Sequence, residues 1–290
     1  MWSTKKTGNT SRYISNNPAM NTETIEQTFS VTTPAQLSLS NLRGRVVVLA
    51  GDPAGHGAPA AIAVSATKYL DTGDAEQTRI TMRQDPDGHV VVITEHETLD
   101  HTGFHKPCRV EYLVRVPRLT SATLSCITCR QEISGLQGEF RLKSVSGEIL
   151  LKDLEGPIEV SNVSGDVQGE RLSGKGLFET TSGQIRLTQG DFPTLKATSV
   201  SGGIYVQTTQ GAGVYRFKTI SGDVTLVLPE GSGYRAELRS ISGKLLTAGT
   251  PAHTGVRGGQ RFVEVGSASS TIQAETVSGN LGLPGKPLSA

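Results

Sequence analysis

Aromatic residues are scarce in this chain of 290 residues, where seven Phe, six Tyr and one Trp make up 5%. A hydrophobic core must therefore be built mainly from aliphatic and small side chains. The chain also contains 34 glycines. Few aromatic residues and many glycines are typical of a β architecture with many turns, and they argue against a globular α/β enzyme.

An excess of one charge and long apolar runs are also absent. The 28 basic and 27 acidic residues give a net charge of +1, which argues against a nucleic acid partner held by long-range attraction. The longest apolar runs, VVVLA at 46–50 and APAAIAV at 58–64, are too short to cross a bilayer, so we expect no direct membrane insertion. Residues 1–26 lack both the apolar segment of a secretory signal and any hydrophobic periodicity. They are predicted to be a disordered tail, and the chain is expected to be cytoplasmic.

Cysteine is rare, and three cysteines are too few for a disulfide framework. Together with two histidines they form the only cluster with plausible zinc spacing: His101, His105, Cys108, Cys126 and Cys129. Against a zinc site, Cys126 and Cys129 lie in a predicted strand with no turn signal between them, and residues three apart in a strand face opposite sides. We therefore expect inert cysteines and no metal or cofactor; a zinc site and a redox pair are the alternatives.

What the sequence does contain is a repeat of the form x-Ser-Gly-x. Its serines follow one another at spacings of 18, 18, 19, 20, 21 and 36 residues, and the last spacing is twice 18. Taken in sequence order, the steps at Ser221 and Ser242 are predicted to lie on consecutive coils of a repeat protein. The seven steps are Ser146-Gly147, Ser164-Gly165, Ser182-Gly183, Ser201-Gly202, Ser221-Gly222, Ser242-Gly243 and Ser278-Gly279.

Residues at a fixed offset from each serine share one character. Alternate positions before the serine are apolar, and the apolar positions change parity after the glycine. Such a change requires a corner, for which glycine supplies a positive φ. The position two before each serine is always small and polar: Ser144, Asn162, Thr180, Ser199, Thr219, Ser240 and Thr276. We expect these side chains to form a hydrogen-bonded ladder inside the fold, since no His or acid recurs at a fixed offset to make one of them a nucleophile.

Each unit is thus a short strand, a Ser-Gly corner, a second strand and a loop, and it can bury its apolar face only by stacking on its neighbours. The sequence predicts an all-β, single-stranded parallel β-helix, or β-solenoid, with coils of 18–21 residues over 131–285. Residues 27–130 are predicted to be irregular coils and a cap: one coil at 35–52, a hairpin at 78–97 around the turn DPDG, and a strand that ends at Pro117. We expect 27–290 to form a single domain.

One pair of outward residues offers an alternative chemistry. Glu148 and Asp166 directly follow corner glycines on successive coils, where they would be neighbours, and paired carboxylates carry acid–base catalysis in polysaccharide-cleaving enzymes. Asp and Glu are also ordinary turn residues beside glycine, and no His or Arg column accompanies the pair. Other outward columns alternate in sign, so no basic stripe for nucleic acid forms.

The order of these features resembles a known family. An LSLSNLRGRVVV opening, a hairpin, a YLVRVP strand, the Ser-Gly coils and a late LVLPEGSGYRAELRSISG coil are similar to the bacterial "putative adhesin" family of β-strand-repeat proteins, whose function is unknown. The resemblance covers residues 27–285. It implies a right-handed solenoid and an association with the cell envelope.

Two functions follow from these observations. The sequence favours a non-catalytic structural or interaction module, a scaffold or adhesin-like protein whose partner is a protein or a glycan, and which can also self-associate through its strand edges. We expect Pro284 and Pro287 to block strand addition at the C-terminal end of the stack. The alternative is a carbohydrate-active β-helix enzyme that uses Glu148 and Asp166.

Overall fold

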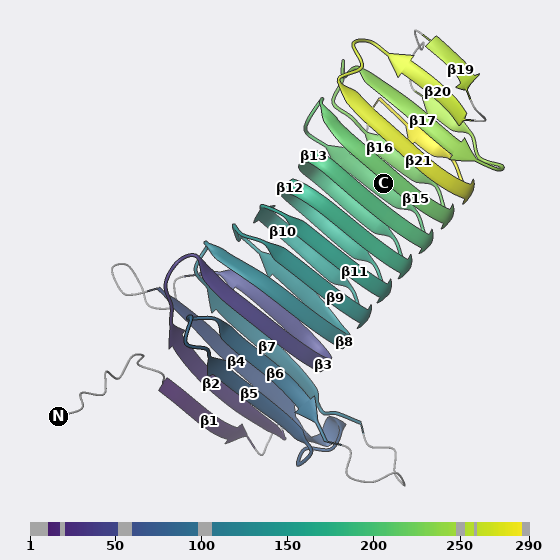
Figure 1. The fold of residues 1–290 in the computed structure, drawn as a ribbon. Helices are drawn as coiled ribbons and strands as arrows, with labels where there is room; N and C mark the ends of the chain where they lie inside the picture. Colours follow the sequence, from purple (N-terminus) through teal and green to yellow (C-terminus); the bar gives the residue numbers. More distant parts are fainter. Residues whose placement is uncertain are drawn as a thin grey trace. The chain divides into compact units, whose positions relative to one another are not determined.

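The computed structural model describes residues 11–17, 21–51, 60–97, 106–247, 253–257 and 260–285. Within these ranges the chain is almost entirely β-strand, with 22 strands and one short 3-10 turn at Leu70–Thr72 (Figure 1). It divides into two compact units, Met1–Gly138 and Glu139–Ala290. The sequence predicted one domain, with the change from cap to regular coils at 130; the division into two units falls eight residues later.

Unit 1 is built around two long strands that run through a corner. The first half of β3 pairs in parallel with β6, the second half pairs in parallel with β7, and β8 pairs with both halves. Antiparallel strands extend the two faces: β5 on β6, and β4, β2 and β1 in turn on β7. The strands are β1 Ser11–Asn17, β2 Thr22–Ser30, β3 Ala35–Ala50, β4 Ala61–Tyr69, β5 Thr78–Gln84, β6 Val90–His96, β7 Arg109–Val116 and β8 Thr120–Ser134.

The predicted coil at 35–52, hairpin at 78–97 and strand ending before Pro117 all correspond to strands of unit 1. The prediction of a disordered tail over 1–26 is wrong for residues 11–17 and 22–26, which lie in β1 and β2. β1 pairs with β2 along its whole length. Its polar sequence fits an edge strand, where one neighbour supplies the hydrogen bonds and periodicity is weak.

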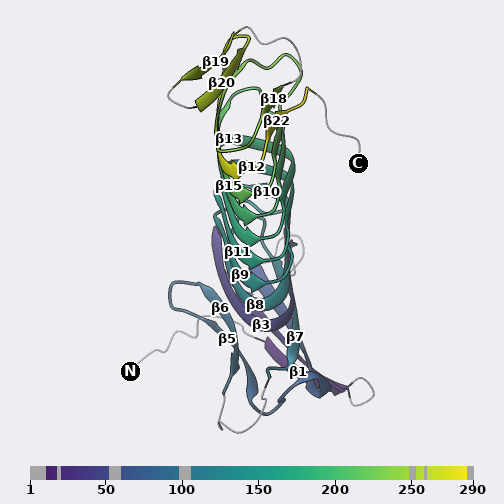
Figure 2. The same ribbon diagram turned by 90° about the vertical axis from the view of Figure 1, so that its right-hand side faces the viewer.

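Unit 2 is a stack of parallel coils, each with a strand on either side of its Ser-Gly corner (Figure 2). The strands before the corner are β9 Phe140–Ser146, β11 Ile158–Ser164, the later parts of β12 Val167–Ser182 and β13 Ile185–Ser201, β15 Gly213–Ser221, β17 Tyr234–Ser240 and β21 Ser270–Ser278. The strands after it are β10 Ile149–Glu155, the first parts of β12 and β13, β14 Ile204–Thr208, β16 Val224–Val227, β18 Leu245–Thr247 and β22 Leu281–Leu283. Equivalent columns pair with one another, as in Asn162↔Ser144 and Val167↔Ile149. The predicted parallel stacking of repeats is therefore present.

The core of unit 2 lies between the two sets of strands and is filled by aliphatic side chains with a few rings. Phe178 and Phe192 meet edge to face with centroids 6.2 Å apart, and both are fully buried. A second bend recurs at 18-residue intervals, where Asp153, Arg171 and Gln189 all have φ near +50°. Arg171 donates to both carboxylate oxygens of Asp153 on the preceding coil, at 2.5 and 3.0 Å. Gly156 and Gly174 follow the first two of these residues by three positions, with φ of +127° and +118°, and the seven Ser-Gly steps of the sequence pattern did not include them.

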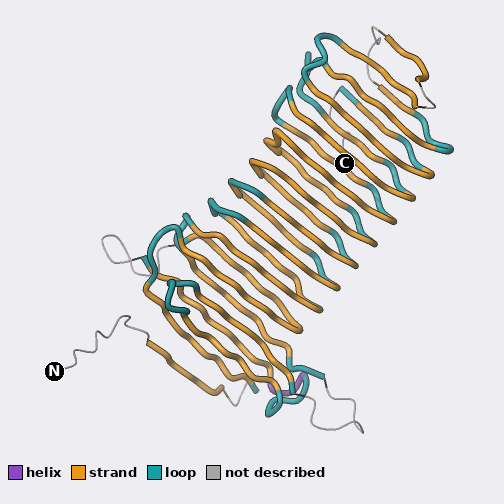
Figure 3. The backbone as a smooth tube through the Cα atoms, viewed as in Figure 1, coloured by secondary structure: helices purple, strands orange, loops and turns teal. Residues whose placement is uncertain are grey.

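The corner requires glycine for two reasons, and Gly202 illustrates both. Its φ is +143°, a conformation that L side chains rarely adopt. A Cβ at this position would lie 2.1 Å from the carbonyl oxygen of Gly183, the corner glycine of the preceding coil. The stacked corners are continuous with the ladders, since Gly202 N–H donates to Ser221 O at 3.1 Å. Figure 3 shows the loops between the strands of unit 2 stacked along the coils. The Ser-Gly step is thus a requirement of coil stacking.

The last coils do not stack in sequence order. β21 pairs in parallel with β15 on one side and with β17 on the other, and β22 lies in the same way between β16 and β18. In Figure 1 the yellow strand β21 accordingly lies between two green ones. The prediction that the Ser221 and Ser242 corners are consecutive is therefore wrong, because Thr276 lies between Thr219 and Ser240 in the inner column.

The outer end of this stack is a hairpin. β20 Gln260–Val265 pairs antiparallel with β17, and β19 His253–Arg257 pairs antiparallel with β20. Pro284 therefore follows an internal coil and does not block the end of the stack as predicted. Pro287 lies outside the described residues.

Candidate functional site

The inner polar column makes fewer hydrogen bonds between coils than predicted. The Asn162 amide donates to the carbonyls of Gly147 at 3.1 Å and Gly165 at 2.9 Å, joining two corners. The hydroxyl groups of Ser144, Thr180, Thr219 and Thr276 are buried without a partner in the part of the chain that the structure describes. Asn162 therefore joins two corners, whereas four hydroxyl groups of the column have no partner among the described residues, so the predicted continuous ladder does not form.

The structure brings the two candidate acids onto neighbouring coils, where each accepts a hydrogen bond from the next coil. Glu148 accepts from the Gln168 side chain at 2.9 Å, and Asp166 accepts from the backbone N–H of Gln184 at 2.9 Å. Asp166 is exposed to solvent. Both carboxylates thus act as hydrogen-bond acceptors that link one corner to the next coil.

The same column repeats this contact where the coil order changes. Asp223 accepts from the backbone N–H of Asn280 at 2.8 Å, and Asn280 in turn accepts from the backbone N–H of Lys244 at 2.9 Å. Three different side chains thus lie in one stack from β16 through β22 to β18. Members of the column after the glycine thus join adjacent coils by hydrogen bonds, although their side chains differ in chemistry.

The cysteine pair lies at a corner, not within a straight strand. Cys126 and Cys129 are both buried, while Ile127 and Thr128 between them are exposed. The expectation that the two thiols face opposite sides is therefore wrong, because β8 turns between them opposite Gly44 of β3. The hydrogen bond with Cys129, together with burial, raises the pKa of the Cys126 thiol, so it stays protonated.

Of the rest of the predicted zinc cluster, the structure describes only Cys108. Cys108 is fully buried in unit 1, and its backbone N–H donates to the Thr78 hydroxyl at 2.9 Å. His101 and His105 lie outside the described residues. Among the residues that are described, no three His, Cys, Asp or Glu side chains are placed to hold a metal ion.

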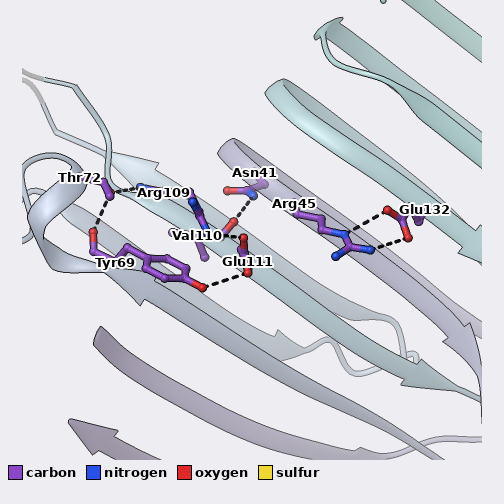
Figure 4. A network of polar contacts seen from close by, with 8 residues as sticks. All are labelled: Asn41, Arg45, Tyr69, Thr72, Arg109, Val110, Glu111 and Glu132. Atoms are coloured by element: carbon purple, nitrogen blue, oxygen red, sulfur yellow. Dashed lines mark hydrogen bonds and ion pairs between the residues drawn. The ribbon is translucent and has the colours of Figure 1, made fainter. Parts of the chain in front are cut away.

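A polar network on unit 1 crosses several strands (Figure 4). The Tyr69 hydroxyl donates to Glu111 at 3.1 Å, Arg109 donates to the other oxygen of Glu111 at 2.7 Å, and the Arg109 guanidinium lies 4.2 Å from the centroid of the Tyr69 ring. The Thr72 hydroxyl accepts from the backbone N–H of Arg109 and donates to the Tyr69 carbonyl, both at 2.7 Å. These contacts fix the end of β4 against β7.

The second half of the network binds one carboxylate from two sides. Arg45 donates to both oxygens of Glu132, at 3.1 and 2.8 Å, and Arg130 donates to one of them at 2.7 Å. Burial alone would raise the pKa of Glu132, but the two arginines outweigh it and hold the pKa below its usual value. Both carboxylates of the network accept hydrogen bonds from arginines or a hydroxyl, so the arrangement suits cross-strand stabilisation.

The most regular exposed feature is the column directly before each serine, which we call the aliphatic row. Six of its seven members are Val or Ile with 41–82% of their surface exposed, and the seventh is an exposed Thr. In stacking order the row is Val145, Val163, Thr181, Val200, Ile220, Val277 and Ile241. At about 4.8 Å per coil it extends for about 29 Å along unit 2.

The row has a polar border on each side. Serines of the corners lie next to it, and all but Ser146 are exposed. The column two residues earlier has mixed charge, with Lys218 opposite Glu275 at 3.9 Å. Surface aliphatic residues scattered singly are normal, but here they recur on six of seven coils and form a regular exposed apolar row. The row could have been predicted from the sequence, because its residues lie an even number of positions from the charged columns and therefore point outward as they do.

Stacked parallel coils with a corner in each repeat define a β-solenoid. Residues 173–283 match the family model described as Toastrack DUF4097, a family of unknown function. The solved structure of a "putative adhesin" from Bacteroides fragilis is similar with a TM-score of 0.51 and 10% identity, over 90% of this chain and 96% of that chain. The resemblance to "putative adhesin" proteins that the sequence indicated is thereby confirmed.

A second "putative adhesin", from Parabacteroides distasonis, has a TM-score of 0.49 and 12% identity, over 90% of this chain and 96% of that chain. No curated protein matches the sequence. None of the helical segments in the described residues is both long and apolar enough to span a membrane.

Proposed function

We propose that this protein is a non-catalytic interaction module, with a scaffold or adhesin-like role at the cell envelope, that binds a protein partner along the aliphatic row. The observation that carries the proposal is the row itself, since a solvated face has no need of an exposed Val or Ile on six of seven coils. Its length and straightness suit an extended chain or a flat sheet of a partner better than a compact small molecule. The absence of aromatic side chains from the row favours a protein over a sugar polymer as partner.

The energy available from the row limits how tight such a contact can be. Complete burial of a Val or Ile is worth about 1.5–3 kcal/mol, so six half-exposed side chains supply about 5–9 kcal/mol. Association itself costs about 4–15 kcal/mol. The partner must therefore also contact the serines or the charged column, and each single contact is weak. Weak contacts at many copies suit an adhesin-like role, in which avidity supplies the strength.

The proposal is tested by photo-crosslinking in the cells that make the protein. A benzophenone amino acid at Val200 should yield an adduct of discrete protein mass, whereas the same group at Gln168, exposed on the other set of strands, should not. Replacing Val163 and Ile220 by Thr, which keeps the β-branched shape, should abolish the adduct. Equal adducts at Val200 and Gln168, an adduct that survives the Thr substitutions, or an adduct digested by glycosidases instead of proteases would refute the proposal.

We infer no catalytic role for Glu148 and Asp166. Support comes from their hydrogen bonds to the next coil and from the equivalent contact of Asp223. The double variant Glu148→Ala/Asp166→Ala should leave activity on a panel of polysaccharides at the level of the unaltered protein. A hydrolytic activity that disappears in this variant would establish the alternative, a carbohydrate-active enzyme.

We also propose that the single chain winds as a right-handed β-helix. Connections between parallel strands of one sheet are right-handed in about 98% of cases, because the twist of the strands favours that hand. An experimental structure with left-handed coils would contradict this.

A further inference from the structure

The last coil of unit 2 fills a slot between coils that were formed by earlier residues. β21 pairs with β15 from Ser270 to Ser278 and with β17 from Ser270 to Thr276, so its two edges are bonded to strands that precede it in sequence. β22 lies in the same way between β16 and β18. The coils from β9 to β16 each lie beside the one directly before them, whereas the β17–β18 coil is separated from the β15–β16 coil by β21 and β22.

The contacts that β21 and β22 make in the slot are of the same kind as the contacts between the other coils. Ile272 and Ala274 on β21 and Leu281 and Leu283 on β22 are buried in the same columns as the aliphatic residues of other coils. At the entrance the Ser269 hydroxyl donates to Gly233 O at 2.7 Å. A second molecule of the same sequence can form all of these bonds equally well.

The connection that leads into the slot is short and exposed. Residues 266–269, GSAS, are all exposed and join β20 to β21, and Gly266 has a φ of +61°. A hollow of about 590 Å³ adjoins this connection, lined by Leu228, Tyr234, Val265, Leu283 and others. The buried Tyr234 hydroxyl has no hydrogen-bond partner among the described residues. Packing is thus incomplete beside the segment that would have to rearrange.

We propose that the last coil exchanges between two copies of this chain. β21 and β22 of one molecule fill the slot between β15–β16 and β17–β18 of the other, and the reverse exchange completes a symmetric dimer. Because every contact in the slot is retained, the two forms differ mainly in the conformation of residues 266–269 and in the entropy of association. A central coil cannot exchange in this way, since each of its edges faces a coil to which the chain directly connects it.

Cysteine pairs across neighbouring strands distinguish this exchange from other association. Lys218 and Glu275 are exposed and directly paired across β15 and β21. Full-length chains carrying Lys218→Cys or Glu275→Cys, with different mass tags, are mixed, unfolded, refolded together and oxidised. The matched control is Glu179→Cys mixed with Thr198→Cys, a pair in the same columns across β12 and β13, whose coils follow directly in sequence.

Exchange predicts at least about tenfold more covalent heterodimer from the Lys218/Glu275 mixture than from the control mixture. Placing both cysteines in one chain should give an intramolecular disulfide in the monomer, which verifies that the substituted slot still forms. Deletion of Ser267 and Ala268 should raise the dimer fraction, because a shortened hinge strains the closed form. Equal heterodimer from the two mixtures, or an unaltered chain that refolds only to monomer at every concentration, would overturn the proposal.

Discussion

Replacing Gly202 by Ala should destabilise unit 2 by more than a change in backbone preference can explain. The φ of +143° costs a residue with a Cβ about 1–3 kcal/mol. The new methyl group would also meet Gly183 O at 2.1 Å and Gly183 C at 2.7 Å, which are backbone atoms that cannot rotate away. Overpacking of this kind costs about 1–3 kcal/mol, so the total is about 2–6 kcal/mol.

Gly231→Ala is the matched control. Gly231 also has a positive φ, +77°, but nothing lies within 4 Å of the Cβ that a substitution would add. It should therefore lose only the backbone contribution of about 1–3 kcal/mol. Urea midpoints of the two variants and the unaltered protein measure the difference, provided that the m-value is unchanged. If both variants unfold at the same urea concentration, the close approach of stacked corners does not explain the glycine.

Two further predictions concern buried polar groups. Asn162→Ala should cost about 2–3 kcal/mol, since it removes two hydrogen bonds to buried corner carbonyls, whereas Thr180→Val in the same column should be neutral or stabilising by up to about 1 kcal/mol. Equal urea midpoints for these two variants would contradict this account. The folded-state pKa of Glu132 is lowered, so its ion pairs stabilise unit 1 fully above the unfolded pKa and are lost as the pH falls through the folded value. Glu132→Gln should therefore lower the urea midpoint at pH 7, and this effect should shrink as the pH is lowered through the folded-state pKa; a loss of equal size at every pH would exclude the ion pairs as its cause.

The column pattern predicted most of the regular architecture because each column has one physical constraint. Apolar residues at alternate positions before the serine indicate a strand with one buried face, and the change of parity after the glycine indicates the corner. The bends at Asp153, Arg171 and Gln189 were not predictable in the same way, because polar residues at positive φ leave no mark in a hydrophobicity pattern. The cysteine corner was missed because Cys129 lies opposite Gly44, at a position where later coils carry glycine.

The aliphatic row was visible in the sequence and overlooked, since a Val or Ile in a strand is expected to be buried. Its exposure follows from parity: the position before the serine is one residue from the buried inner column, so it must point outward. Counting outward columns at offsets of one, three and five residues would have revealed it. The functional candidate was therefore available from the pattern, whereas the hydrogen bonds of Asp166 and Asp223 required the structure.

The order of the last coils shows that the repeat pattern alone does not determine which coil stacks on which. Because every coil presents the same columns, the edge of β15 accepts the strand of Ser242 or that of Ser278 equally well, and only the connections decide between them. The spacing of 36 residues indicated a break in the repeat, and the antiparallel strands β19 and β20 lie within it. Once β20 is paired antiparallel with β17, the chain re-enters beside β17 on its remaining edge, which is the edge that faces β15. The uniformity that made the fold recognisable is thus also what makes its last coil exchangeable.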